Sequence, residues 1–292
     1  MRSFLALYLT ENVLDAVRHL LKNSPVEIDH LEATKTWKTF RVANGVAPHA
    51  KMLTAPDENA KMNRSGKPDY SLSLAPADTS GPMVINGKEE IVNVCRYFTE
   101  TCKNGCIAHQ GRARMVKKGF VNRIARGRAL KVKFLIEDPS AFCTLVKKEV
   151  LAAVKKHGEI GVRLNAFSDI TWETVCPWLL ETPNVTWYDY SKWPNRTVPS
   201  NYHLLFSASD RTSDAEIVRR VKSGENVAVV FNAKYRTNGH WQIPLPTEFH
   251  GVPVIDGDKV DTRYEDPKGV VVGLRIKGNA MALQPGKMVR PL

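Results

Sequence analysis

The sequence predicts an α/β fold whose mostly parallel sheet forms an open or closed barrel of the TIM-like or radical-SAM-like kind. Strand-like apolar runs alternate with helix-like stretches through most of the chain. Helix caps separate the two, as where Asp138 precedes Pro139 and where Ser213 and Glu216 form a capping box. With 292 residues, 43% of them hydrophobic, the chain has enough apolar material for a sizeable core.

The predicted elements follow from residue spacing. Strands are expected where short apolar runs end in turn residues, at 70–74, 130–136, 161–165, 185–190, 202–207, 226–232 and 270–276. Helices are expected where apolar residues recur at helical spacing, at 12–22, 112–126, 138–158, 171–180 and 213–224. Residues 1–66 hold one such helix and then a polar tract, so we expect an N-terminal appendage or lid there and a barrel-like domain at 67–292.

The charge balance favours a polyanionic partner. Lys and Arg number 42 against 30 Asp and Glu, a formal charge of +12. We therefore expect nucleic acid as partner, DNA rather than RNA, although charge alone is also compatible with a solvated surface. The apolar run at 227–231 is far shorter than the roughly 20 residues of a membrane span, and no signal peptide is evident, so a cytoplasmic protein without a membrane partner is expected.

A cluster of cysteines is the most informative local feature. Cys95, Cys102, Cys106 and His109 have the spacing C-x6-C-x3-C-x2-H within the segment 95–109. Thiolates and an imidazole suit zinc or an iron–sulfur cluster, and three thiolates without His109 would leave one iron of a cubane cluster open. The spacing matches no standard zinc finger, and three free thiols are the alternative.

Basic residues follow the cysteines at once. Nine Lys and Arg and no acid lie between 112 and 133. The candidates for nucleic-acid contact are Arg112, Arg114, Lys117, Lys118, Arg123, Arg126 and Arg128. A solvated helix face is the alternative interpretation.

Polar side chains gather where predicted strands end and in an acidic loop at 256–266. Such groups form the active sites of parallel barrels, although each taken singly is more often a cap or turn former. The candidate catalytic residues are Asp169, Asp189, Asp256 and Asp258. The candidate substrate-binding residues are Asn165, Ser168, Tyr190, Lys192, Asp261 and Arg263.

Several segments also carry a family resemblance. They are CIAHQGRAR, GVRLNAFSDITWE, TWYDYSK, SNYHLLFSAS and VIDGDKVDTRYEDPKGVVVGL. Together they resemble, over roughly residues 67–280, the family of phage proteins called gene product 88. The resemblance implies a phage origin, and hence the host cytoplasm, and places Cys95, Cys102 and Cys106 at the cysteine positions of a family whose function is unknown.

Three functions are compatible with these residues. The first is an enzyme that modifies a nucleic-acid base, with the aspartates used as in base-exchanging transglycosylases. The second is an iron–sulfur radical enzyme that acts on a nucleotide. The third is a non-catalytic DNA-binding protein of phage replication or host takeover.

Overall fold

A large, mostly parallel sheet organises the computed structural model, which describes residues 13–58, 62, 64–109, 122–234, 243–277 and 288–292. Its parallel strands are, in spatial order, β3 (Asp69–Leu72), β6 (Ile160–Arg163), β7 (Val185–Ser191), β8 (Tyr202–Ser207), β9 (Val227–Lys234), β12 (Val271–Ile276) and β11 (Val252–Asp256). Antiparallel strands β2 (Leu53–Thr54) and β10 (Glu248–Phe249) form the two edges. The predicted α/β class with a mostly parallel sheet is confirmed.

The sheet is open among the described strands. Its order runs from β10 at one edge to β2 at the other without closing, and β13 (Val289–Arg290) pairs in parallel with the second half of β9. From β3 to β9 the spatial order follows the chain order, as in a sheet that curls toward a barrel. The carboxyl ends of these strands therefore lie along the same edge.

A small second sheet lies beside the cysteine segment. It consists of β1 (Val13–Asp15), parallel to β5 (Lys88–Asn93), and β4 (Pro82–Ile85), antiparallel to β5. Asn86 and Gly87 join the hairpin and both have positive φ, as a tight two-residue turn between right-twisted strands requires. The dipeptide Asn-Gly is a signal for this hairpin that the sequence analysis missed.

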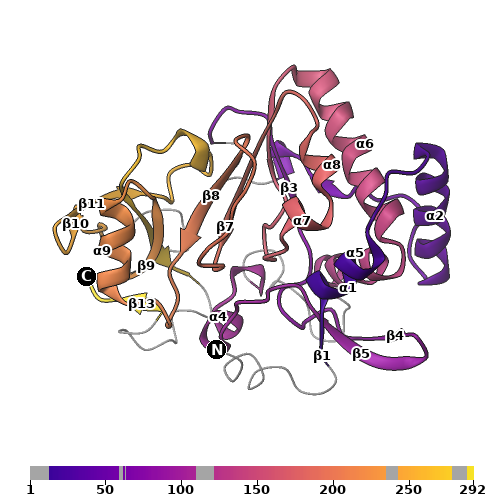
Figure 1. Ribbon diagram of the computed structural model, residues 1–292, viewed down its shortest axis with the longest axis horizontal. Helices are drawn as coiled ribbons and strands as arrows, with labels where there is room; N and C mark the ends of the chain where they lie inside the picture. Colours follow the sequence, from indigo (N-terminus) through magenta and orange to yellow (C-terminus); the bar gives the residue numbers. More distant parts are fainter. Residues whose placement is uncertain (1–12, 59–61, 63, 110–121, 235–242, 278–287) are drawn as a thin grey trace.

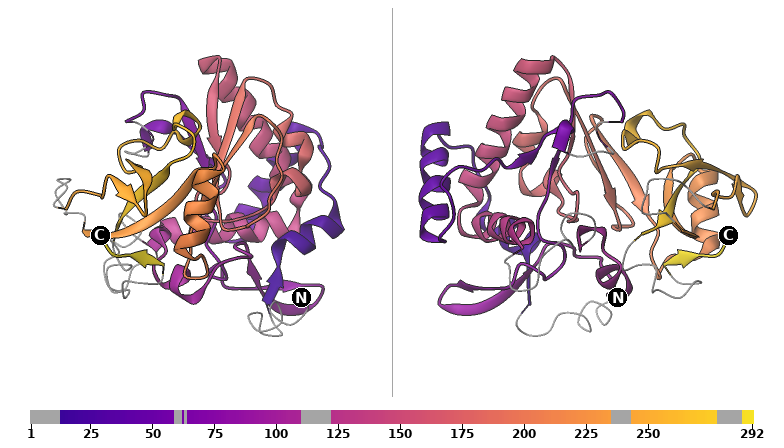
Figure 2. Two further views of the ribbon diagram at one scale, coloured as in Figure 1. Left: turned by 60° about the vertical axis from the view of Figure 1, so that its left-hand side comes forward. Right: turned by 180° about the vertical axis from the view of Figure 1, so that it is seen from behind.

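Most helices cover one half of the molecule (Figure 1). They are α1 (Ala16–Asn23), α2 (His30–Ala43), α5 (Arg123–Glu137), α6 (Pro139–His157), α7 (Trp172–Val175) and α8 (Pro177–Leu180). The other half carries α9 (Asp214–Lys222) beside β9 to β13, and Figure 2 shows the same division from behind. Below the lower ends of β7 and β8 in Figure 1 lies α4 (Glu100–Asn104), which belongs to the cysteine segment.

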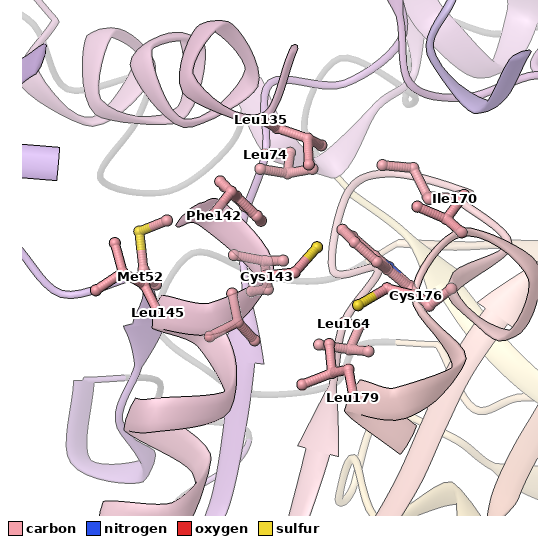
Figure 3. Packing of buried hydrophobic residues seen from close by; sticks show 14 of the residues in the cluster. Met52, Leu74, Leu135, Phe142, Cys143, Leu145, Leu164, Ile170, Cys176 and Leu179 are labelled. Atoms are coloured by element: carbon pink, nitrogen blue, oxygen red, sulfur yellow. The ribbon is translucent and has the colours of Figure 1, made fainter. Parts of the chain in front are cut away.

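The largest hydrophobic core lies between these helices and strands β3, β6 and β7. Phe142 is fully buried there, with its ring centroid 6.2 Å from that of Phe134 and 6.4 Å from that of Trp172. Figure 3 shows the sulfur atoms of Cys143 and Cys176 inside this core, far from solvent. These two cysteines are packing residues rather than members of the cysteine segment.

Three predicted elements differ in the structure. Residues 130–136 are not a strand but the end of α5. The side chain of Asn122 caps this helix by accepting from the N–H of Ala125 at 3.0 Å, and the helix continues to Glu137. Lys131 on this helix donates from Nζ to the carbonyl of Met52 at 2.6 Å. Burial lowers the pKa of Lys131 to about 8.

The other two differences have local causes. The helix predicted at 171–180 is divided into α7 and α8, because Pro177 cannot donate the hydrogen bond that would continue α7. The helix predicted at 12–22 begins only at Ala16, because residues 13–15 pair with β5. In addition, residues 30–43 form α2 where a polar tract was expected, and the side chain of Asp29 caps this helix.

The described part of the N-terminal segment is packed into the main body. Ala16 and Leu20 of α1, and Trp37 of α2, belong to the largest core, while β2 extends the main sheet. The carboxylate of Glu149 on α6 accepts hydrogen bonds from the backbone of Met52 and Leu53 at 2.8 and 2.9 Å. None of the helices formed by described residues has both the length and the apolar character needed to cross a membrane.

Candidate functional site

The cysteine segment follows β5 and lies against the carboxyl end of the parallel sheet. Cys95 is fixed from two sides: its Sγ accepts from the backbone N–H of Ala77 at 3.2 Å and donates to the carbonyl of Phe167 at 3.3 Å. Cys102 lies in α4, where Thr99 caps the helix by accepting from the N–H of Cys102 at 3.1 Å. Local capping and backbone contacts thus hold the segment in place.

Two basic side chains connect this segment to the rest of the fold. Lys103 of α4 donates to Asp78 at 2.7 Å. Arg128 of α5 donates to the carbonyl of Ala108 at 2.6 Å and places its guanidinium 4.3 Å from the centre of the Phe167 ring. Arg128 therefore supports the cysteine segment from behind.

The three thiols open onto one cavity of about 300 Å³. The cavity lies between the cysteine segment, the loops after β6 and β7, and the acidic loop after β11. Predicted site residues that line it are Cys95, Cys102, Cys106, Asn165, Ser168, Asp169, Tyr190, Lys192, Asp258 and Asp261. Segments more than 150 residues apart in the sequence therefore meet there, as expected for the carboxyl edge of a parallel sheet.

The thiols sit in a buried and electrostatically coupled environment. Burial, and then the neighbouring Cys102, Asp169 and Cys106, raise the pKa of the Cys95 thiol. Burial alone would lower the pKa of Lys192, but the thiols and the carboxylate of Asp169 raise it overall. The Lys192 ammonium is thus a positive charge that interacts with all three cysteines.

Thiol groups suit a soft metal centre, but the described side chains around this cavity are too far apart to bind a single ion. Among the residues that the structure describes, no three His, Cys, Asp or Glu side chains converge as closely as a single bound ion requires. His109 ends the short 3-10 helix η2 (Ile107–His109), and its side chain is outside the described part. The three thiols that share the cavity wall are the groups that could bind a metal centre.

Asn165 and Asp189 form a structural network behind the cavity wall. The backbone N–H of Asn165 donates to Asp189 at 2.7 Å, and the side-chain oxygen of Asn165 accepts from Ser168 at 2.8 Å and from the N–H of Ile170 at 2.9 Å. Tyr202 donates to the other oxygen of Asp189 at 2.6 Å. Burial raises the pKa of Asp189 to about 6. This network shapes the loop after β6, and Asp189 itself does not line the cavity.

Asp169 does line the cavity, and three donors hold its carboxylate. They are the hydroxyl of Ser191 at 2.7 Å, the backbone N–H of Lys192 at 2.9 Å and Nη1 of Arg196 at 3.3 Å. Burial raises the pKa of Asp169, while Arg196 opposes that shift. These three hydrogen bonds fix the orientation of the Asp169 carboxylate and occupy the lone pairs that a nucleophile would need.

The acidic loop places its carboxylates beside arginines. Asp258 lines the cavity and accepts from the backbone N–H of Arg275 at 2.8 Å and from Nζ of Lys277. Asp256 pairs with Nη1 of Arg275 at 2.9 Å and does not line the cavity. Asp261 lies 3.1 Å from Nη1 of Arg163. The loop is therefore tied to the sheet by ion pairs.

Arg263 points elsewhere. Its Nη2 donates to the carbonyl of Val260 at 2.7 Å, its Nη1 lies 3.3 Å from Asp266, and it lines a different cavity from the cysteines. Sequence reasoning also missed the cationic part of the site, which is formed by Arg163, Arg275 and Lys277. Their positions at the ends of β6 and β12 are the signal that could have identified them.

The predicted basic surface is only partly described. Arg112, Arg114, Lys117 and Lys118 lie outside the described residues. Arg123 is exposed at the start of α5, and Arg126 donates to the carbonyl of Asn44 at 2.7 Å. Nucleic-acid contact by these residues stays a prediction.

Comparison with known proteins gives one match. A family model described as Gene product 88 covers residues 49–290, which includes every described part of the site. No curated protein and no solved structure matches the chain. The resemblance drawn from the sequence segments is thereby confirmed.

Proposed function

Because this chain belongs to the gene product 88 family, to which no activity is assigned, we propose a function from its cavity: an iron–sulfur enzyme that carries out radical chemistry on a nucleotide. The observation that carries the proposal is the meeting of three thiols and Lys192 in one cavity at the carboxyl edge of a parallel sheet. Cofactor and substrate sites of parallel α/β folds occur at this edge.

Cys95, Cys102 and Cys106 are the proposed ligands. In a four-iron cluster each thiolate binds a different iron, so the thiols need not converge on one point as they would around a tetrahedral zinc ion. Three ligands leave one iron open to a small molecule in the cavity. When bound, such a cluster would supply one-electron chemistry to that molecule.

The residues around the thiols have separate tasks in this proposal. Lys192 offsets the negative charge that three thiolates bring into a buried place. Apolar side chains of Phe98, Ile107 and Leu274 line the same cavity and would limit the access of water to a bound molecule. Asp258, held by Arg275 and Lys277, offers an oriented acceptor to a polar group of the bound molecule.

Two further expectations belong to the same proposal. The open sheet acts as an incomplete barrel, whose unclosed side admits a substrate larger than the cavity. The substrate is a nucleotide, most simply one within DNA, because the chain has a formal charge of +12 and a polyanion would be attracted to it.

A second candidate function rests on the aspartates. Asp169 and Asp258 both line the cavity, as a base-exchanging enzyme with carboxylate catalysis would need. We place this function second because the hydroxyl of Ser191 and the guanidinium of Arg196 already donate hydrogen bonds to the carboxylate of Asp169.

Metal analysis of anaerobically purified protein tests the proposal. We expect about four iron atoms per chain and a broad visible absorption band, both lost in Cys102→Ser. Cys143→Ala is the matched control, because Cys143 is a core thiol outside the cavity and its removal should leave the iron in place. Circular dichroism of each variant checks that the fold is kept.

Two results would contradict it. Zinc in place of iron, lost in Cys102→Ser, would make the cysteines a structural clamp and move the aspartates to first place. Absence of any metal from wild-type protein, including after anaerobic reconstitution with iron and sulfide, would overturn the cluster.

A further inference from the structure

A second cavity, of about 620 Å³, lies on the other side of Asp169 from the cysteines. Asp169 lines the cysteine cavity, whereas Ser191 and Arg196, which donate to its carboxylate, line the second one. A layer of hydrogen-bonded side chains thus separates the two spaces, and none of the residues around the second cavity is a proposed cluster ligand.

Incomplete strand pairing opens this cavity. Strand β8 pairs with β7 from Tyr202 to Phe206, but it pairs with β9 only at Phe206 and Ser207. Before Phe206, strand β8 has no partner in β9, because β9 begins at the level of Phe206. One edge of the first part of β8 therefore borders the cavity, together with the end of α9 and the segment 263–268. The opening is a feature of the backbone, not of one side-chain rotamer.

The arginines of the cavity wall are already neutralised. Nη1 of Arg220 lies 2.7 Å from Glu225, and Nε of Arg196 lies 2.7 Å from Glu173. These pairs stiffen the wall and leave little charge for a ligand.

Positive charge remains at the opposite end. Within the part of the chain that the structure describes, the Lys268 ammonium has no ion-pair partner. Arg263 pairs with Asp266 through Nη1 at 3.3 Å, while its buried Nε has no hydrogen-bond partner among the described residues. A buried guanidinium nitrogen left unmatched is costly unless an anion or water completes its contacts. This end of the cavity therefore suits a phosphate or another small anion.

Aromatic rings lie next to these cations. Tyr264 is held in place because its hydroxyl donates to Asp69 at 2.9 Å and its ring meets Tyr188 edge-on at 5.3 Å. The exposed ring of His203 lies 6.2 Å from that of Tyr264, centroid to centroid. Rigid rings beside a cation are the usual surface on which a nucleic-acid base stacks.

We infer that the second cavity binds a nucleotide, with its phosphate near Lys268 and Arg263 and its base against His203 and Tyr264. The cavity volume lies within the range of about 300 to 1,000 Å³ that small-molecule sites occupy. The inference is independent of any metal at the cysteines, so it can hold or fail without the proposed function.

Calorimetric titration of the full chain with deoxyadenosine monophosphate tests it. We expect saturable binding, weakened about tenfold or more in Lys268→Glu, because a cation that contacts the phosphate becomes an anion. His203→Ala should weaken binding by a similar factor through loss of stacking. Lys155→Glu, an exposed lysine on α6, is the charge-matched control and should bind as wild type does.

Titrations with deoxyadenosine and with inorganic phosphate separate the two halves of the ligand. Each should bind more weakly than the nucleotide. The inference is overturned if the nucleotide does not bind, if both cavity variants bind it as wild type does, or if phosphate alone binds equally well. Thermal melting of every variant confirms its fold, and Lys268→Ala replaces Lys268→Glu if the latter melts early.

Discussion

The two halves of the molecule are stabilised in different ways. The half that contains α1, α2 and α5 to α8 has one large apolar core, in which Trp37, Phe134, Phe142 and Trp172 are buried. The half that contains β9 to β13 and α9 has three smaller apolar clusters. Buried arginines take the place of a large core there: Arg275 pairs with Asp256 and Asp258, and Arg290 pairs with Asp214.

The contrast between apolar packing and buried ion pairs indicates which half supplies the charged groups of the cysteine cavity. The half with the large apolar core is held mainly by side-chain packing, so it serves as a rigid support for the cysteine segment. A half that depends on ion pairs already contains oriented charges, and Asp258 and Arg275 of that half line the cysteine cavity. The cavity lies where the two halves meet.

The largest expected effect breaks the apolar half. Phe142→Ala removes a fully buried ring, and we expect the free energy of unfolding to fall by about 4 kcal/mol, from lost burial and the cavity left behind. Urea denaturation of both proteins measures the change. The control is Leu151→Ala on the same helix, where a partly exposed side chain should cost less than about 1 kcal/mol. Equal losses in the two variants would mean that the large core is not what holds this half.

A somewhat smaller effect is expected in the ion-paired half. Asp258→Asn removes the carboxylate that faces Arg275 and Lys277, and we expect a loss of about 3 kcal/mol because the buried Arg275 loses one of the two carboxylates, Asp256 and Asp258, with which it pairs. Denaturation at low and high salt measures it. Asp57→Asn, at an exposed carboxylate, is the control and should be near neutral. A neutral Asp258→Asn would show that the ion pairs of this half specify geometry without adding stability.

The smallest effect concerns a carboxylate inside the apolar half. Burial raises the pKa of Asp69 from 3.8 to about 6, so between these values the folded chain binds more protons than the unfolded chain. Stability contributed by protonated Asp69 is present below pH 4 and is lost as pH rises through 6. From pH 4 to pH 7 we expect wild type to lose about 2 kcal/mol more than Asp69→Asn, which cannot ionise.

Denaturation midpoints at several pH values test this expectation. Asp189 has a raised pKa from the same cause, so Asp69→Asn should keep part of the wild-type trend. Asp57→Asn should keep all of it. Parallel curves for wild type and Asp69→Asn would show that Asp69 is already ionised in the folded protein at pH 4.

Local signals predicted the parallel sheet well. Strand β8 matches its predicted residues, and the cap at Asp138 and the capping box at Ser213 both begin helices where expected. These signals are complete within a few residues, so they do not depend on the rest of the fold. The strand predicted at 130–136 was wrong because these residues continue α5, whose cap at Asn122 lies well before the predicted strand.

The site was predicted as a set of segments rather than as a geometry. Strand-end reasoning brought Asp169, Lys192 and Asp258 to one cavity with the cysteines. It could not separate Asp189 from them, because the donors that hold Asp189 inward are distant in sequence: Asn165 follows β6 and Tyr202 lies on β8. Nor could it assign Arg263 to the second cavity, since the path of the loop after β11 depends on the ion pairs of Asp258 and Asp261 with arginines of the sheet.

That loop has a consequence for how the family can diverge. Its first part places Asp258 and Asp261 in the cysteine cavity, and its second part places Tyr264 and Lys268 in the other. An insertion or deletion between residues 258 and 268 would therefore shift the walls of both spaces in one step. If the length of this segment is kept, substitutions can alter the wall of one cavity without moving the other. A change in its length alters the walls of both cavities at once.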